Sequence, residues 1–391
     1  MKHDLEIKKL GEVAKFQGGS QPPKSTFVYE ATEGYIRLLQ IRDFKSDEKA
    51  TFIPISSKNR ICETDDVLIG RYGASVGKIC TGKSGAYNVA LIKALPNTEI
   101  MNIKYFINYL KSILFQKPLS SVSERSAQNG FNKHDISGFP IPIPPIDEQK
   151  RIVAKLDECF EAIDKARANV QKNLNNAKEL FQSQLNQIFS QKGDGWVEKI
   201  LDEIGETQTG TTPSTKDKSN YGDFIPFVKP PHFKPDGSID AGNSMLSESG
   251  LKIGRLFPPN SVLMVCIGAT IGKTGFTETA VSSNQQINCL TPNENYYPKL
   301  FYYGLISPFV QKQVADIGKG AQATLPIINK TKWQGLRINI PESKSEQIKI
   351  VKQLDDLKSQ TQSLEANYQQ ELDALDELKK SILQKAFNGE L

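Results

Sequence analysis

The sequence predicts an α+β protein in which two similar mixed α/β domains alternate with two long helices that form an antiparallel coiled coil. The order of segments in residues 9–189 returns in residues 199–387, at an offset that drifts from about 190 to 198 residues. In addition, residues 147–189 and 346–387 contain neither glycine nor proline. A period this long is not that of a solenoid repeat. Each unit is large enough for a domain plus a helix, so we expect a fused pseudo-dimer with an internal two-fold repeat.

Three short motifs fix the alignment of the two copies. They are Gly73-Ala-Ser-Val-Gly-Lys78 with Gly268-Ala-Thr-Ile-Gly-Lys273, Asn132-Lys133 with Asn329-Lys330, and Glu148-Gln149 with Glu346-Gln347. From these matches we expect a first domain at 1–146 and a spacer helix at 147–190. A second domain then follows at 191–342 and a second helix at 343–391.

The helical stretches carry apolar residues close to every 3.5 positions, which is typical of amphipathic helices that pair. The expected contact positions are Ile152, Leu156, Cys159, Ile163, Ala166, Val170, Ala177 and Leu180 in the first helix, and Ile350, Leu354, Leu357, Thr361, Leu364, Tyr368, Leu375, Leu378 and Ile382 in the second. Each helix spans about 60 Å. The simplest partner for each helix is the other copy, in an antiparallel coiled coil. The competing hypothesis is pairing with a separate chain.

Short runs rich in β-branched and aromatic residues predict the strands of the two domains. These runs are 35–41, 67–69, 89–95, 224–228, 261–267 and 287–290. Each domain also contains one helical stretch, near 103–115 and 297–314. The proline-rich segment 140–145 is expected to be extended and to form a stiff junction between the first domain and its helix.

Composition excludes several classes of protein. No run approaches 18 apolar residues, so no membrane span is expected. The amino-terminal residues lack the apolar segment of a signal peptide, and we expect a cytoplasmic protein. Five scattered cysteines and three histidines show no zinc-ligand spacing, so no metal site is expected.

The net charge of +5 is unevenly distributed. Residues 1–146 carry 20 Lys and Arg against 14 Asp and Glu, whereas residues 343–391 carry 7 against 9. The positive charge therefore lies in the globular segments. This fits contact with a polyanion, although a slightly basic protein of any function would show the same total.

The repeated Gly-Ala-Ser/Thr-Val/Ile-Gly-Lys motif is not a P-loop. It has three residues between its glycines where a P-loop has four, and Lys78 is followed by Ile79, which cannot bind magnesium. Two compatible interpretations remain, a glycine turn between strands and an exposed loop that carries Lys78 or Lys273 to a DNA phosphate.

The sequence contains neither a complete methyltransferase loop nor a repeated catalytic triad. Lys229-Pro-Pro-His-Phe233 has the prolines and aromatic residue of an adenine methyltransferase loop, but lysine replaces the amide that would hold the target base. The histidines are too few, and too unlike in the two copies, for a repeated catalytic triad.

Amide and basic side chains gather in two places in each copy. One is 126–133, matched by 318–324 and 329–330, and the other is Tyr87-Asn88, matched by 283–286. Asn and Gln can bind adenine through two hydrogen bonds, and Arg or Lys can bind guanine. The alternative interpretation is polar turns whose amides hydrogen-bond locally.

Taken in order, these segments resemble the specificity subunit of type I restriction–modification systems over essentially the whole chain. The residues that carry the resemblance are the two glycine turns, Thr209-Gly-Thr-Thr-Pro-Ser214, Ser283-Asn-Gln-Gln286, Ile143-Pro-Pro-Ile-Asp-Glu-Gln149 and the segment Ser381–Leu391. The first domain departs from the family pattern at Gly19-Ser-Gln-Pro-Pro23 and at Tyr87-Asn88-Val89, so its half-site cannot be inferred.

The resemblance implies that each domain is a target-recognition domain that binds one half of a split, asymmetric double-stranded DNA site. The helices would set the gap between the half-sites and bind two methyltransferase subunits, which motor–nuclease subunits would join. S-adenosylmethionine, ATP and magnesium would belong to those partners, and this chain would bind no cofactor and catalyse no reaction. The expected DNA contacts are Arg37, Gln40, Arg42, Arg71, Tyr72, Ser75, Lys78, Asn88, Gln128, Asn129 and Lys133 in the first domain, and Lys229, His232, Thr270, Lys273, Asn284, Gln285, Gln286, Lys319, Gln322, Thr324 and Lys330 in the second.

Two other classes of function stay open. A self-contained DNA-modifying enzyme would need a nucleotide loop or an acidic site, which the sequence lacks. A coiled-coil scaffold whose globular ends bind protein would show no salt-dependent affinity for DNA.

Overall fold

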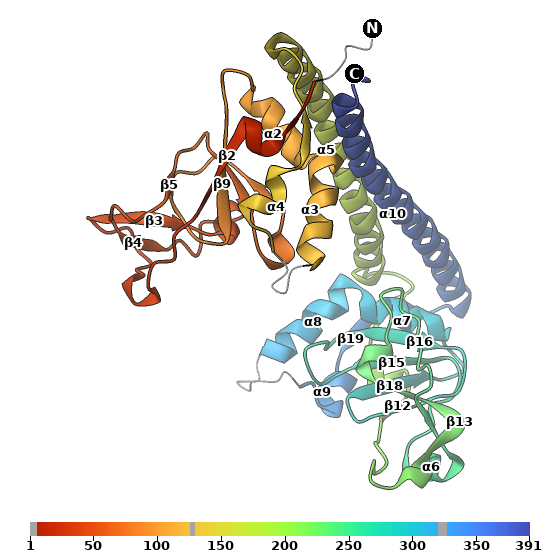
Figure 1. The fold of residues 1–391 in the computed structure, drawn as a ribbon. Coiled ribbons are helices and arrows are strands. Elements are labelled where there is room, and N and C mark those ends of the chain that lie inside the picture. The colour runs from red at the N-terminus through yellow and green to blue at the C-terminus, as the bar shows by residue number, and fades with distance from the viewer. Residues whose placement is uncertain (1–5, 126–129, 320–326) are drawn as a thin grey trace. The chain divides into compact units, whose positions relative to one another are not determined.

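The computed structural model describes residues 6–125, 130–319 and 327–391. It divides into two compact units, the first formed by Met1–Val170 with Gln370–Leu391 and the second by Gln171–Gln369. Two helices of 44 residues each, α5 (Ile146–Phe189) and α10 (Lys344–Phe387), contribute one part to each unit. Each unit therefore consists of one domain and a segment of both long helices (Figure 1).

The first domain contains strands and helices that form two four-stranded sheets with a helical layer. Its strands are β1 (Ile7–Lys9), β2 (Ala14–Gly18), β3 (Tyr35–Leu39), β4 (Phe52–Pro54), β5 (Ile61–Cys62), β6 (Val67–Gly70), β7 (Ile79–Cys80), β8 (Gly85–Tyr87), β9 (Leu91–Pro96) and β10 (Pro140–Pro142). Its helices are α1 (Leu10–Val13), α2 (Ile103–Lys111), α3 (Ile113–Arg125) and α4 (Lys133–Ser137). One sheet has the order β2–β9–β6–β7, the other has the order β4–β3–β8–β5, and β1 pairs with β10.

The second domain repeats this topology. Its strands are β11 (Trp196–Ile200), β12 (Gly205–Thr209), β13 (Tyr221–Val228), β14 (Met245–Leu246), β15 (Ser261–Val265), β16 (Thr274–Thr277), β17 (Ser282–Ser283), β18 (Ile287–Pro292) and β19 (Arg337–Pro341), and its helices are α6 (Glu248–Ile253), α7 (Pro298–Ile306), α8 (Pro308–Lys319) and α9 (Lys330–Gln334). The sheet β12–β18–β15–β16 matches β2–β9–β6–β7 strand for strand. The parallel pair β13–β17 matches β3–β8, and β11–β19 matches β1–β10. The internal repeat is confirmed as a repeat of fold.

All six predicted strands are present, but each predicted helical stretch is two helices. The breaks fall at Ser112 and Ser307, which are buried and extended. The Ser112 hydroxyl donates to the carbonyl of Tyr109 at 2.7 Å, and that of Ser307 donates to Gly304 at 2.6 Å. A serine competes with the backbone for hydrogen bonds in this way, so it allows the chain to bend between two helices.

Helices α5 and α10 are antiparallel where they meet in the first unit. Arg151 donates to the backbone of Leu391, Asp164 pairs with Lys379 at 2.8 Å, and Arg167 pairs with Asp376. Residue numbers in these pairs therefore increase along α5 while they decrease along α10, so the two helices run in opposite directions. The predicted intramolecular pairing of the helices is confirmed.

In the second unit the later part of α5 meets the earlier part of α10, which is again the antiparallel sense. Leu185 and Phe189 share one core with Ile350 and Leu354. The predicted contact positions are wrong at Leu180, Leu364 and Leu378, whose side chains are 51%, 39% and 46% exposed. A helix of 3.6 residues per turn drifts away from a 3.5-residue pattern, so leucines outside that pattern, Leu174, Leu185, Leu372 and Leu383, are buried instead.

The core of each unit lies between the two long helices and one sheet, β2–β9–β6–β7 in the first unit and β12–β18–β15–β16 in the second. In the first unit α2 and α3 occupy this space (Figure 1). Tyr105 and Tyr109 of α2 are fully buried there. Their hydroxyls donate to the carbonyls of Pro142 and Pro140 at 3.0 and 2.9 Å. Their rings pack on Phe387 of α10, with centroids 5.0 and 5.9 Å apart. The carboxyl end of α10 thus completes the core of the first unit.

Candidate nucleic-acid interface

In the first unit the loops that follow four strands meet at one edge. We call this the first loop cluster, formed by residues 18–20, 40–44, 70–75, 87–90 and 130–131. Backbone hydrogen bonds tie the loops together, from Ser20 to Tyr87 at 3.0 Å, from Asn88 to Leu39 at 3.1 Å and from Arg71 to Ala90 at 2.9 Å. Loops at strand ends carry most binding residues because the strands beneath hold them rigidly.

Glycine is required where these loops approach each other most closely. A Cβ at Gly19 would lie 2.0 Å from the carbonyl oxygen of Asn88, and a Cβ at Gly70 would lie 2.1 Å from that of Ser75. No other residue fits at such distances. The segment that departs from the family pattern at residue 19 therefore still makes a close approach to the backbone of Asn88.

Arg71 holds the first loop cluster together. Its Nε donates to the carbonyl of Phe131 at 3.2 Å and its Nη1 donates to that of Val89 at 3.5 Å. Its guanidinium also stacks on the ring of Tyr72, 4.9 Å from the centroid. The guanidinium of Arg71 thus links neighbouring loops through hydrogen bonds, whereas the Tyr72 side chain stays exposed.

The predicted contacts Arg37, Gln40 and Arg42 are bonded within the domain. Arg37 pairs with Asp47, and Lys83 shares that carboxylate. Hydrogen bonds from Lys83 and then Arg37 lower the pKa of Asp47 below its usual value. The side chains of Gln40 and Arg42 both donate to the buried hydroxyl of Thr51, at 3.5 and 3.3 Å.

The second unit builds the equivalent second loop cluster, formed by residues 210–214, 228–232, 266–270, 283–286 and 327–328. Thr211 donates to the carbonyl of Ser283 at 2.9 Å, and Asn284 donates to Val228 at 3.1 Å. Cys266 donates to Gln286 at 2.7 Å. The same strand ends thus meet in both domains.

Three neighbouring amides lie in the second loop cluster. The Nδ2 of Asn284 donates to the Oε1 of Gln286 at 2.8 Å, and the Nε2 of Gln286 donates to the carbonyl of Ile267 at 3.4 Å. Both side chains are half-buried. Gln285 is exposed, and its Oε1 accepts a hydrogen bond from the hydroxyl of Thr212.

Lys229 precedes, and His232 ends, a short 3₁₀ turn, Pro230–His232, that follows β13. The Nδ1 of His232 accepts a hydrogen bond from the backbone of Lys229 at 3.2 Å. Burial, and then the nearby charge of Lys229, lower the pKa of His232 below its usual value. The neutral imidazole therefore stabilises this turn.

Both glycine-rich motifs form turns between strands, as expected. Gly77 and Gly272 have φ of 77° and 88°, a backbone conformation that favours glycine. The carbonyl of Gly77 accepts from Gln116 of α3 at 2.9 Å, and that of Gly272 accepts from Gln311 of α8 at 3.1 Å. The turns are thus fixed to the helical layer.

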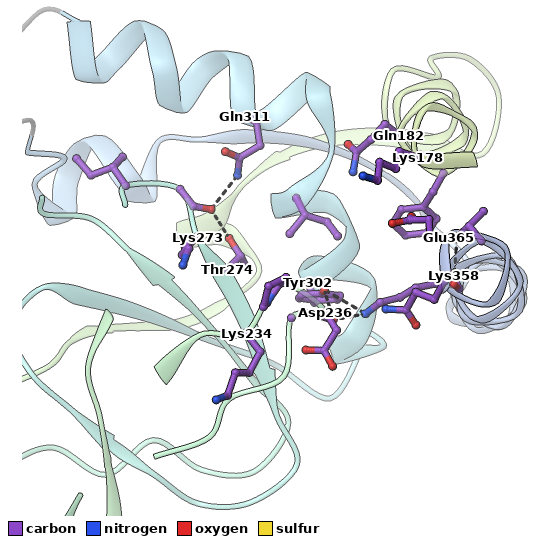
Figure 2. A pocket seen from close by; sticks show the side chains of 18 residues that line it. Lys178, Gln182, Lys234, Asp236, Lys273, Thr274, Tyr302, Gln311, Lys358 and Glu365 are labelled. Atoms are coloured by element: carbon purple, nitrogen blue, oxygen red, sulfur yellow. Dashed lines mark hydrogen bonds between the residues drawn. The ribbon is translucent and has the colours of Figure 1, made fainter. Parts of the chain in front are cut away.

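Lys273 lines a cavity of about 730 Å³ in the second unit, between the domain and the long helices. Figure 2 shows Lys178 of α5 and Lys358 of α10 in its wall as well. Lys358 donates to the Tyr302 hydroxyl at 3.3 Å, and burial lowers the pKa of its ammonium. Lys273 of the glycine turn thus lies in the wall of a cavity that lysines of both long helices also line.

The sequence matches the family described as the type I restriction modification DNA specificity domain twice, over residues 2–174 and 193–374. The chain belongs to this family. Each of its two matched segments is therefore a DNA specificity domain with the start of the long helix that follows it.

Two curated relatives are specificity subunits. The chain is 32% identical to the type I restriction enzyme HindI specificity subunit of Haemophilus influenzae over 139 residues, which is 35% of this chain and 30% of the relative. It is 25% identical to the MjaVIII specificity subunit of Methanocaldococcus jannaschii over 222 residues, 53% of this chain and 50% of the relative. The chain thus aligns with half or less of the length of these relatives.

A solved structure shares the whole fold. It comes from work on complex assembly and conformational transition of the type I R-M system. The alignment covers 100% of this chain and 100% of that chain, with a TM-score of 0.79 and 21% sequence identity. The fold of the chain, two domains that alternate with two long helices, is therefore that of a known structure.

The remaining predicted contacts of the specificity domains are placed as follows. Lys133 and Lys330 are exposed at the first positions of α4 and α9, which Asn132 and Asn329 cap. Ser75 and Thr270 lie in the glycine turns, and Lys78 is half-buried beside the first of them. Gln128, Asn129, Gln322 and Thr324 lie outside the described residues, as does the side chain of Lys319.

Thr212 is not among the predicted contacts, although it lies in the Thr209–Ser214 motif. The sequence did indicate this position, because the motif follows a strand in the same way as Gly19-Ser20 does in the first specificity domain.

Within the described ranges, none of the helices has the length and apolar character that a membrane span requires. In the same ranges, no group of three His, Cys, Asp or Glu side chains could bind a metal ion.

Proposed function

We propose that this chain is the specificity subunit of a type I restriction–modification complex, in which each specificity domain recognises one half of a split, asymmetric DNA site. The observation that carries the proposal is that equivalent strand ends build one loop cluster in each domain, and that the two clusters carry different side chains. Arg71, Tyr72, Val89 and Ala90 in the first are replaced by Cys266, Ile267, Gln285 and Gln286 in the second, whereas Asn88 and Asn284 are equivalent asparagines. A repeated fold with different contact residues suits two different half-sites.

The proposal extends to the partners. Two methyltransferase subunits would bind the long helices, and motor–nuclease subunits would join them. Leu180, Leu364 and Leu378 support this docking, because they expose apolar side chains on otherwise polar helix surfaces. The partners would bind S-adenosylmethionine, ATP and magnesium, so that this chain contributes binding and no catalysis.

Mapping of methylated adenines tests the proposal. The full chain is co-expressed with its methyltransferase subunit, and methylation is mapped on a library of random duplexes with S-adenosylmethionine present. We expect a bipartite motif whose methylation requires both proteins. A self-contained enzyme would methylate without the partner, and a scaffold would leave methylation independent of sequence.

Docking on the helices is tested by changing an exposed leucine. Leu364→Glu should lower co-purification of the methyltransferase subunit at least severalfold, because a charge replaces apolar contact area. The matched control is Ser363→Glu, which adds the same charge at an exposed neighbouring position. Equal co-purification of both variants would argue against docking at Leu364.

A further inference from the structure

The three amides of the second loop cluster are not equivalent. Asn284 and Gln286 bond to each other twice, through Nδ2 to Oε1 at 2.8 Å and through the backbone of Gln286 to the Oδ1 of Asn284 at 3.2 Å. Gln286 also donates to the carbonyl of Ile267. These two side chains therefore maintain the shape of the loop.

Gln285 lies between them and is free to bind another molecule. Its side chain is exposed, and its Oε1 accepts the hydroxyl hydrogen of Thr212 from the neighbouring loop. Within the described part of the chain, its Nε2 donates to no protein group. Thr212 thereby fixes which end of the amide is held by the protein and which end points away from it.

A glutamine with an unconstrained amide usually binds adenine, because its oxygen accepts from N6 while its nitrogen donates to N7. Here the hydroxyl of Thr212 bonds to one lone pair of the oxygen and holds that end of the amide against the protein, so the end that faces outward is the Nε2 donor. In the major groove, guanine offers two acceptors side by side, O6 and N7, whereas adenine places a donor beside its single acceptor. An amide that turns its NH₂ group outward fits the two acceptors of guanine and opposes the N6 amino group of adenine.

We propose that Gln285, oriented by Thr212, is a specificity-determining residue that selects guanine over adenine at one position of the second half-site. This inference rests on the proposed function, since it requires the second loop cluster to lie in the major groove. Gln285 contacts the base, whereas Thr212 is a positioning residue that acts through it.

The test is methylation mapping with the full chain and its methyltransferase subunit on random duplexes. Thr212→Val removes the hydroxyl at nearly constant shape, so the released amide should accept adenine at that position, with a change in the guanine-to-adenine ratio of about tenfold or more. Thr212→Ser keeps the hydroxyl and should retain guanine. Gln285→Glu presents only acceptors and should reject guanine.

The first half-site is the internal control, because every variant should leave it unchanged if the protein folds and assembles. Thr215→Val, an exposed threonine in the same loop, should leave both half-sites unchanged. The inference is overturned if the wild-type second half-site contains no guanine, or if Thr212→Val and Gln285→Glu leave it unaltered. Absence of any bipartite motif with the wild-type chain would instead reject the proposed function.

Discussion

Gln149 and Gln347 occupy the same place in the two halves of the molecule and share two equivalent hydrogen bonds. Each is fully buried in the first turn of a long helix. The Oε1 of Gln149 accepts from the backbone of Asn102, and that of Gln347 accepts from Tyr297, both at 2.8 Å. Each Nε2 donates to a proline carbonyl, Pro144 or Pro341, at 2.9 Å. One glutamine side chain thus joins each domain to the long helix that follows it.

Gln347→Ala should destabilise the second unit by about 2–4 kcal/mol, because two buried backbone groups lose their partners. The effect is measured as the shift of the denaturant unfolding midpoint. Gln353→Ala, at an exposed position of the same helix, is the control and should change stability by less than about 0.5 kcal/mol. Similar shifts for both variants would show that the buried amide does not stabilise the joint.

Phe387→Ala should destabilise the first unit by about 3–5 kcal/mol, because it removes a buried ring that packs on Tyr105 and Tyr109. Amide hydrogen exchange should report faster opening of α2 while the second unit keeps its protection. Leu378→Ala removes an exposed side chain of the same helix and should have little effect. Equal loss of protection in both units of Phe387→Ala would contradict this assignment.

His232 should make the second unit sensitive to acid. Its folded-state pKa is lowered from 6.5, so the unfolded chain takes up the proton first as the pH falls. Stability should therefore decrease from about pH 6.5 down to the folded-state pKa and level off below it. His232→Asn keeps an acceptor for the backbone of Lys229 and should abolish this contribution, as thermal melts of both proteins between pH 5 and 8 can show. Parallel pH profiles would mean that His232 does not cause the sensitivity.

Lys78→Ala should weaken DNA binding at all sequences and lower the slope of log K against log salt by about 1. In the described residues the Lys78 ammonium has no ion-pair partner, so its charge is available to a phosphate. Lys380→Ala, which removes a lysine paired with Glu377 at 2.6 Å, is the control and should leave the slope unchanged. An unaltered slope for Lys78→Ala would leave the turn with a structural role alone.

Four residues inserted after Asn173 should widen the gap between the half-sites by one or two base pairs. The insertion lengthens α5 by about 6 Å, and base pairs are spaced by about 3.4 Å. A second variant carries a matching insertion after Gln369, so that both helices lengthen together. Replacement of Asn173, Asn175 and Asn176 by alanine is the control of constant length. Altered half-sites with an unaltered gap would show that the helices are not the spacer.

Local patterns were sufficient to predict the strands and long helices, because each pattern is contained in one continuous segment. The loop clusters could not be predicted in this way. Arg71 bonds to Phe131, 60 residues further on, and only the fold brings those two segments together. An amide that bonds within its own loop looks the same in a sequence as one that binds DNA. Asn284 and Gln285 are adjacent and chemically alike, yet only the hydrogen bonds of the structure distinguish their roles.

The contact of Phe387 with Tyr105 and Tyr109 has a consequence for biosynthesis. The aromatic core of the first unit contains a ring from the far end of the chain, so this core cannot close while the ribosome is still translating the second domain. The second unit, by contrast, is a continuous segment, Gln171–Gln369, and can fold as soon as that segment has emerged. The domain that is made first is therefore the one that matures last, and until then its exposed tyrosines and phenylalanines are a natural target for chaperones.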